Sequence, residues 1–165
     1  MRILIDGYNI IRRIPELSAL DRADMEEGRD YLIGELSRYR SGKGHGIVVV
    51  FDGAGSYHLG DRGSRVKGIT VIYSRQGRSA DDVIAALCRE GKADLLVTAD
   101  RELCQRAERA GVPSATPELF WKKLEEEKFR KMKGLETEDE DYPSHGQGRR
   151  LRKKVRKVKN LLSRL

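Results

Sequence analysis

The chain has 165 residues and a formal net charge of +7, with 36% charged and 38% hydrophobic residues. This length fits one domain with its own core plus an appendage, and no stretch approaches the roughly 20 apolar residues of a membrane helix. We therefore expect no membrane partner. We expect no secretory signal, because Met1-Arg2 leads directly into a predicted strand, and the two cysteines lack the spacing of a disulfide framework. Both features favour a cytoplasmic protein.

The N-terminal half alternates between apolar runs and polar connections. Residues 2–5 (RILI) predict a strand that ends at Asp6, and residues 24–40 predict a helix with an apolar stripe. The β-branched run 47–51 (IVVVF) is typical of a strand buried on both faces. Residues 53–68 contain five glycines and no periodicity, so we expect a mobile loop there.

The C-terminal half repeats the alternation. Ser79 is a suitable N-cap for the first helix of this half. Strands are predicted at 69–73 and 94–98 and in a fifth segment after Pro113, and helices over 80–90, 101–110 and 118–133. Strands that alternate with helices indicate an α/β fold with a mainly parallel β-sheet flanked by helices.

Composition divides the chain into three parts. We expect a folded domain over residues 1–133, an acidic, glycine-containing linker over 134–148 and a basic amphipathic helical tail over 149–165. The tail holds nine Lys or Arg residues and no acid, whereas the rest of the chain carries a formal charge of −2. Such a separate cationic end indicates an arm for nucleic acid or an anionic surface.

Carboxylates recur where predicted strands end or helices begin. In an open parallel sheet the carboxyl ends of the strands line one crevice, so these acids are expected to converge. Oxygen ligands of this kind suit Mg²⁺ or Mn²⁺. The alternative at each position is a helix cap or a favourable charge at a helix N-terminus. The set comprises Asp6, Asp52, the adjacent Asp81 and Asp82, and Asp100.

Several polar residues flank these acids. Asn9 follows Asp6 by three positions and could contact a ligand, and Thr98 could orient the Asp100 carboxylate or contact a phosphate. Asp52 could brace the loop after it or orient the residues around the metal. Because neighbouring residues do not share a helix face, at most one of Asp81 and Asp82 is expected to point straight at the site, while the other reaches it from the helix edge or only caps the helix. Taken with Asp6 and Asp100, at least one of the pair is expected to belong to the site.

A crevice of carboxylates with a divalent cation suits phosphodiester hydrolysis, because the cation activates water and neutralises charge on the phosphate. No phosphate-binding or dinucleotide motif is present, so no nucleotide cofactor is expected. Basic residues are needed to hold the polyanion. The candidates for RNA binding are Arg62, Arg65, Lys67, Arg75, Arg78 and Arg101 in the domain, and Arg149, Arg150, Arg152, Lys153, Lys154, Arg156 and Lys157 in the tail.

The segments DGYNII, VVFDG, SADDVI and VTADREL, in this order and spacing, resemble the NYN domain in its YacP-like branch, within the PIN-like nuclease group. The resemblance covers roughly residues 1–130, with the basic tail outside it or at its margin. It implies a metal-dependent ribonuclease in which Asp6, Asp81 or Asp82, and Asp100 hold Mg²⁺ or Mn²⁺. Asn9 would be a site residue beside them, and Asp52 a supporting one.

We therefore expect an endoribonuclease that hydrolyses single-stranded or looped RNA, such as mRNA or rRNA, and leaves a 5′-phosphate and a 3′-hydroxyl. Its catalytic set would be Asp6, Asp81, Asp82, Asp100 and Asn9, with Asp6, Asp81 and Asp100 as the metal ligands and Asp52 and Thr98 in support. The main alternative is a non-catalytic RNA- or ribosome-binding module. A structure-specific DNA nuclease and a phosphatase of small metabolites are further alternatives. The ribosome is a candidate partner of the tail.

Overall fold

The computed structural model describes residues 1–53, 63–75 and 77–133. Within these ranges six strands form one sheet in the order β3-β4-β2-β1-β5-β6, and all neighbouring strands are parallel except β3 and β4. The strands are β1 (Arg2–Asp6), β2 (Gly46–Phe51), β3 (Ser64–Val66), β4 (Ile69–Tyr73), β5 (Leu95–Val97) and β6 (Ser114–Ala115). The predicted α/β class with a mainly parallel sheet is confirmed.

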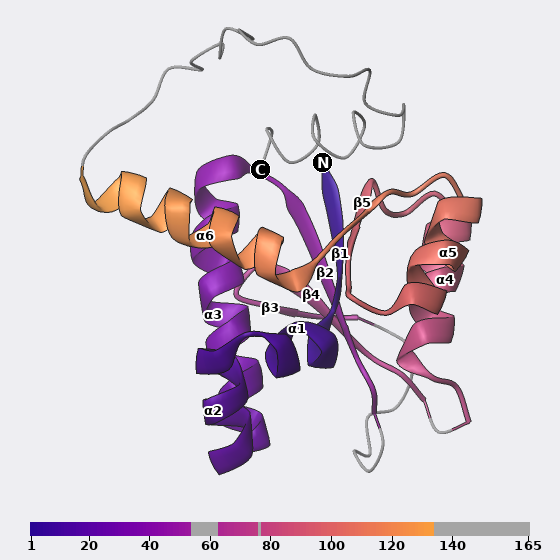
Figure 1. The fold of residues 1–165 in the computed structure, drawn as a ribbon, viewed down its shortest axis with the longest axis horizontal. Helices are drawn as coiled ribbons and strands as arrows, with labels where there is room; N and C mark the ends of the chain where they lie inside the picture. The colour runs from indigo at the N-terminus through magenta and orange to yellow at the C-terminus, as the bar shows by residue number, and fades with distance from the viewer. Residues whose placement is uncertain (54–62, 76, 134–165) are drawn as a thin grey trace, which may run out of the picture.

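The helices cover both faces of the sheet (Figure 1). One core lies between the sheet and the helices of the N-terminal part together with α6, and a second lies under α4 and α5. The helices are α1 (Gly7–Arg13), α2 (Pro15–Ala23), α3 (Met25–Lys43), α4 (Ala80–Arg89), α5 (Arg101–Arg109) and α6 (Pro117–Met132). None of these helices is both long enough and apolar enough to cross a membrane.

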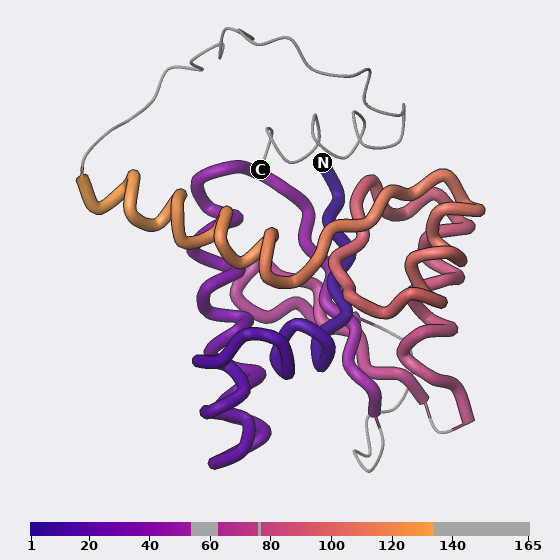
Figure 2. Tube along the Cα trace, in the orientation of Figure 1, coloured from indigo at the N-terminus to yellow at the C-terminus, as the bar shows by residue number. Residues whose placement is uncertain are grey.

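The two central strands explain why the sheet places the acids together. Ile3 and Ile5 of β1 and Val49 and Val50 of β2 have no exposed surface, as expected of strands covered on both faces. β1 lies between β2 and β5 in the sheet. Figure 2 shows the course of the backbone from β1 at the N-terminus through the rest of the domain. Because all three strands run in parallel, their carboxyl ends meet at one edge.

Most strands and helices that were predicted from apolar runs lie within a few residues of their predicted bounds. The segments that connect them differ more from the prediction. The mobile loop predicted over 53–68 is wrong at residues 64–66, which form β3, antiparallel to β4. Residues 54–62 lie outside the described residues. All three residues of β3 are exposed, so no hydrophobic pattern marked it. Its one signal was the turn at Lys67 and Gly68, whose φ angles of 49° and 83° suit a two-residue hairpin.

The sequence analysis also left the segment between β1 and α3 without defined helices. α1 follows β1 directly, and α2 begins at Pro15, a position where the fixed φ of proline favours a helix start. α1 is important for the site because it lies over the end of β2. A Cβ at Gly7 would collide with the ring of Phe51, so only glycine allows this close approach.

Candidate active site

A pocket of about 320 Å³ opens at the carboxyl ends of the central strands. Four carboxylates line it, which are Asp6, Asp52, Asp81 and Asp100. They come from β1, the end of β2, the start of α4 and the start of α5. The structure thus brings together acids that are nearly one hundred positions apart in sequence. Their shared location agrees with the prediction, while their chemical roles stay predictions.

Asp6 is the most buried of these carboxylates, with 8% of its surface exposed. It ends β1 and caps α1, where Oδ1 accepts a hydrogen bond from the Asn9 backbone N–H at 3.3 Å. Oδ2 accepts a second from the Thr98 hydroxyl at 2.9 Å. Burial raises the pKa of Asp6 to about 6, and the charges of Asp81 and Asp100 add to this rise while the two hydrogen bonds oppose it.

The adjacent acids of α4 point in different directions. Asp81 lines the pocket, and burial together with the charge of Asp100 raises its pKa. Asp82 is exposed and forms a salt bridge of 2.7 Å with Arg106, whose hydrogen bond lowers the pKa of Asp82. The choice that the sequence left open therefore has a geometric answer: Asp81 faces the other acids, and Asp82 does not.

Thr98 ties the ends of β1 and β5 together. Its side chain is almost completely buried, donates to Asp6 and accepts a hydrogen bond from the Asp100 backbone N–H at 3.1 Å. Thr98 therefore orients Asp6 instead of the Asp100 carboxylate, and its burial keeps it from a substrate phosphate. The Asp100 carboxylate itself caps α5 by accepting from the Leu103 N–H at 2.8 Å.

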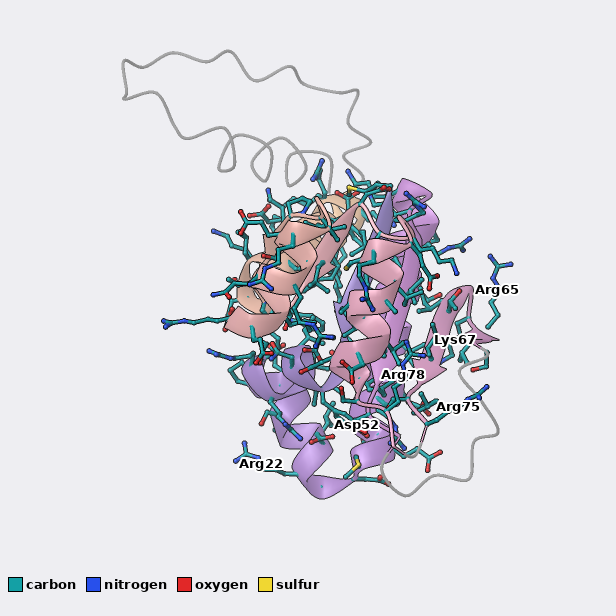
Figure 3. The ribbon with its side chains drawn as sticks, turned by 90° about the vertical axis from the view of Figure 1, so that its right-hand side faces the viewer. Arg22, Asp52, Arg65, Lys67, Arg75 and Arg78 are labelled. Carbon is teal, nitrogen blue, oxygen red and sulfur yellow. The ribbon has the colours of Figure 1, made fainter. Side chains whose placement is uncertain are left out.

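Asn9 and Asp52 complete the frame of the pocket. Asn9 lines it, and its side-chain oxygen accepts a hydrogen bond from the Ala99 N–H at 2.8 Å, which holds the loop before α5 against α1. Asp52 is exposed at the end of β2 and accepts a hydrogen bond from the Ser74 hydroxyl at 3.1 Å. Figure 3 labels Asp52 among the side chains at this end of the molecule.

The residues present fit a divalent cation in their chemistry. All four acids offer oxygen, the donor that Mg²⁺ and Mn²⁺ prefer. Two arginines line the same pocket, Arg12 and Arg13, so the lining carries a formal charge of about −2 that one divalent cation would balance. Across the described ranges, however, no three His, Cys, Asp or Glu side chains are grouped closely enough to hold a metal as they stand.

None of the predicted basic residues that the structure describes lines the pocket. Arg65, Lys67 and Arg75 lie on the same side of the molecule in Figure 3, with Arg65 and Lys67 beside the start of β4 and Arg75 just beyond its end. Arg78 precedes α4 and Arg101 begins α5, and both are exposed. Arg62 and the seven tail residues that were predicted to bind RNA lie outside the described residues.

Besides Ala80, sequence analysis missed three polar or aromatic lining residues, namely Tyr8, Arg12 and Arg13 of α1. Their signal was available in DGYNIIRR, because Arg12 follows Tyr8 by four positions and Arg13 follows Asn9 by four. On a helix this spacing places each pair on one face. This spacing has a meaning only on a helix, and the sequence does not predict one over residues 7–13.

Comparisons with known proteins agree with this architecture. The family model of the YacP-like NYN domain matches residues 3–163, which extends well beyond residue 130, where the resemblance had been expected to end. A Bacillus subtilis (strain 168) protein described as uncharacterized protein YacP is 33% identical over 87 residues, or 53% of this chain. The matched segment spans 51% of that relative's length.

Two solved structures share the fold. A crystal structure of Rae1 (YacP) from Bacillus subtilis, carrying a tryptophan-to-leucine mutation, superposes with a TM-score of 0.68 at 21% identity, covering 99% of this chain and 92% of that one. A second crystal structure of Rae1 (YacP) gives a TM-score of 0.68 at 24% identity, covering 82% and 79%. At these identities the likeness shows the fold alone.

Proposed function

Because this chain belongs to the YacP-like NYN domain family, within the PIN-like nuclease group, we propose that it is an Mg²⁺- or Mn²⁺-dependent endoribonuclease. It would hydrolyse phosphodiester bonds in single-stranded or looped RNA and leave a 5′-phosphate and a 3′-hydroxyl. The observation that carries the proposal is the convergence of Asp6, Asp81 and Asp100 on one pocket.

The electrostatics of the pocket favour catalysis over simple RNA binding. A binding site for a polyanion gains nothing from carboxylates, which repel phosphate at short range. Here burial and the charges of neighbouring acids raise the pKa values of Asp6 and Asp81, which is a cost to the folded protein. A bound cation would remove this repulsion and attract the phosphate. The non-catalytic RNA- or ribosome-binding module, our alternative, leaves the acids without a purpose.

Asp6, Asp81 and Asp100 are the residues that would hold the cation. The cation would supply positive charge against the phosphate and lower the pKa of a water molecule. The protein's own contribution is orientation. Thr98 fixes the Asp6 carboxylate through its 2.9 Å hydrogen bond. Asn9 holds the loop that leads to Asp100, and Asp52 lies at the rim, where it accepts from Ser74.

Binding of the RNA strand would depend on the basic residues outside the pocket. Arg75 follows the end of β4, and Arg78 and Arg101 lie at the starts of α4 and α5, close to the acids. Arg65 and Lys67 lie farther away, beside the start of β4, and the tail over 149–165 adds nine cations. Contacts of this kind bind phosphate without reading sequence and weaken with salt. RNA is the proposed partner, with the ribosome as a further candidate for the tail. A cytoplasmic location remains a prediction.

The direct test incubates labelled RNA and DNA with the protein in Mg²⁺, Mn²⁺ or EDTA. We expect cleavage of RNA that requires the metal and is lost in Asp6→Asn and Asp100→Asn. Asp94→Asn is a matched control, because Asp94 directly precedes β5 at the amino ends of the strands, away from the pocket, and pairs with Arg2. Binding without cleavage would support the binding module. Cleavage that survives in both pocket variants would refute the assignment.

A second test separates the tail from the pocket. Deleting residues 149–165 should weaken RNA binding at physiological salt, because it removes nine phosphate-binding cations. Metal-dependent cleavage of short oligonucleotides should persist. An equal loss of binding and of short-substrate cleavage would contradict this division between the two parts.

A further inference from the structure

The pocket has two walls of different chemistry. The acids of α4 and α5 form one, and residues of α1 form the other. On α1, the Arg12 guanidinium lies over the Tyr8 ring at 5.7 Å from its centre, and Arg13 lines the pocket beside them. Arg12 and Arg13 are exposed, and Tyr8 is half-buried. A stacked aromatic ring and guanidinium at the rim of an acidic pocket are not needed to hold a divalent cation.

The Tyr8 ring is fixed before any ligand arrives. Its hydroxyl accepts a hydrogen bond from Arg29 Nη1 at 3.0 Å and donates to the Met25 sulfur at 3.3 Å. Phe51 packs edge-on against the ring, with centroids 5.2 Å apart, and in turn stacks on Tyr73. A side chain held from both its hydroxyl and its ring loses little conformational entropy when it binds a ligand.

This combination matches the way proteins hold unpaired nucleotides. Bases splayed out of a strand stack on aromatic rings or on the planar guanidinium of arginine. A base inside a duplex has both faces covered by its neighbours and cannot use such a platform. Arg13 forms only a loose 3.7 Å ion pair with Glu118, in which both side chains are about half exposed. A phosphate could therefore compete for Arg13 at little cost.

We propose that Tyr8, Arg12 and Arg13 form a nucleotide-binding wall, at which one unpaired base of single-stranded RNA stacks on the Tyr8–Arg12 pair while Arg13 contacts a flanking phosphate. The proposal rests on the proposed function only in taking RNA as the ligand. It restricts the substrate to strands with an unpaired nucleotide next to the bond that enters the acidic pocket. Paired RNA is excluded because its bases cannot reach the ring.

The test uses the full chain in EDTA, so that binding is measured without cleavage. Single-stranded RNA oligonucleotides carry 2-aminopurine at successive positions, because stacking quenches its fluorescence. For the wild type we expect quenching, with a duplex of the same sequence unaffected. Tyr8→Leu should abolish the quenching and weaken binding about tenfold, the usual effect of losing one stacked base. Tyr8→Phe keeps the ring and should restore the quenching.

Arginine variants test the rest of the wall. Arg12→Gln should reduce the quenching and Arg13→Gln should leave it, while Arg13→Gln lowers the salt dependence of binding by about one charge. Matched controls are Tyr31→Leu on α3 and Arg22→Gln on α2, both exposed positions that do not line this pocket. Both should bind and quench like the wild type. If circular dichroism shows that Tyr8→Leu does not fold, the quenching by Arg12→Gln tests whether a base stacks on the Tyr8–Arg12 pair.

Three results would overturn the wall: no quenching by the wild type, equal quenching by wild type and Tyr8→Leu, or the same Tyr8 dependence with duplex RNA. Cleavage in Mg²⁺ or Mn²⁺ is measured on the same preparations. Cleavage without Tyr8-dependent stacking would refute the nucleotide-binding wall and support the nuclease function. Tyr8-dependent stacking without any cleavage would refute the nuclease function and support the nucleotide-binding wall.

Discussion

Asp6 and Glu35 are buried to nearly the same extent, with 8% and 7% of their surfaces exposed, but their surroundings are opposite. Glu35, on α3, forms salt bridges with Arg38 at 2.6 Å and with Lys128 of α6 at 3.4 Å. Among the described residues, no basic side chain forms a salt bridge with Asp6. Its hydrogen-bond donors are neutral, and burial together with the charges of two other acids raises its pKa.

Glu127 extends this contrast. It is also buried, and it pairs with Lys43 at 3.4 Å and with Arg130 at 2.8 Å. The acids between α3 and α6 are thus compensated by the protein itself and need no ligand. The acids at the carboxyl edge of the sheet are not compensated in this way. Buried charge without a partner is costly, and such perturbed groups cluster at functional sites. The comparison therefore supports the proposal that the acids at the carboxyl edge of the sheet are functional, whereas those between α3 and α6 are structural.

The largest expected effect distinguishes Asp81 from its neighbour. Asp81→Asn should lower RNA cleavage by about 10²–10³-fold, the usual cost of removing one group that stabilises the transition state electrostatically. Asp82→Asn removes an exposed salt bridge with Arg106 and should cleave at close to the wild-type rate. Initial rates with saturating Mg²⁺ provide the measurement. If Asp82→Asn lowered the cleavage rate more than Asp81→Asn did, the assignment of Asp81 to the site would be wrong.

The next effect concerns pH in the metal-free protein. The pKa of Asp6 is about 6 in the folded state instead of the ordinary 3.8, so the folded state binds more protons between these values and stability falls as pH rises through this window. The ionised carboxylate costs roughly 2–3 kcal/mol above pH 6. The cost disappears once the pH falls below the unfolded-state pKa.

Urea unfolding in EDTA between pH 4 and 7.5 measures this effect. The stability of Asp6→Asn relative to the wild type should increase as pH rises, because the variant has no charge to bury. Mg²⁺ or Mn²⁺ should then stabilise the wild type at neutral pH more than the variant. A stability difference that stays constant with pH would show that Asp6 is compensated after all.

A smaller effect is expected at the compensated acid. Glu35→Gln should destabilise the protein by about 1 kcal/mol, because its partners Arg38 and Lys128 are at least half exposed and remain hydrated when the charge is lost. Cleavage by the folded variant should match that of the wild type. Loss of cleavage comparable to that of Asp81→Asn would erase the distinction between the two groups of acids.

Most of the fold could be predicted because its strands are strongly apolar. The run IVVVF and the segment ITVIY are buried strands whose pattern allows little else. β3 was missed because three exposed residues carry no hydrophobic signal, and its pairing depends on a neighbouring strand. α2 was missed although Pro15 marks its start, because its nine residues bury a single side chain, Leu17, and leave only a weak apolar stripe.

The site could be predicted in outline for a topological reason. Parallel strands deliver their ends to one edge, so Asp6 and Asp100 had to approach each other once the strand order was β2-β1-β5. Side-chain direction could not be predicted in the same way. Asp82 faces Arg106 because of the packing of α4 against α5, and Thr98 serves Asp6 instead of the Asp100 carboxylate because β1 and β5 are adjacent. Both outcomes depend on contacts between distant segments.

The smallest effect tests whether charge near the uncompensated acids matters more than charge elsewhere. Arg101 directly follows Asp100 at the start of α5, and Arg109 lies at the other end of the same helix; both are exposed arginines. Arg101→Gln should weaken RNA binding by a few fold and lower the slope of log affinity against log salt by about one, the loss of one phosphate contact. Arg109→Gln removes the same charge and should leave the slope unchanged. Equal slopes for the two variants would mean that the strand is held by net charge and not by a path that leads into the acidic pocket.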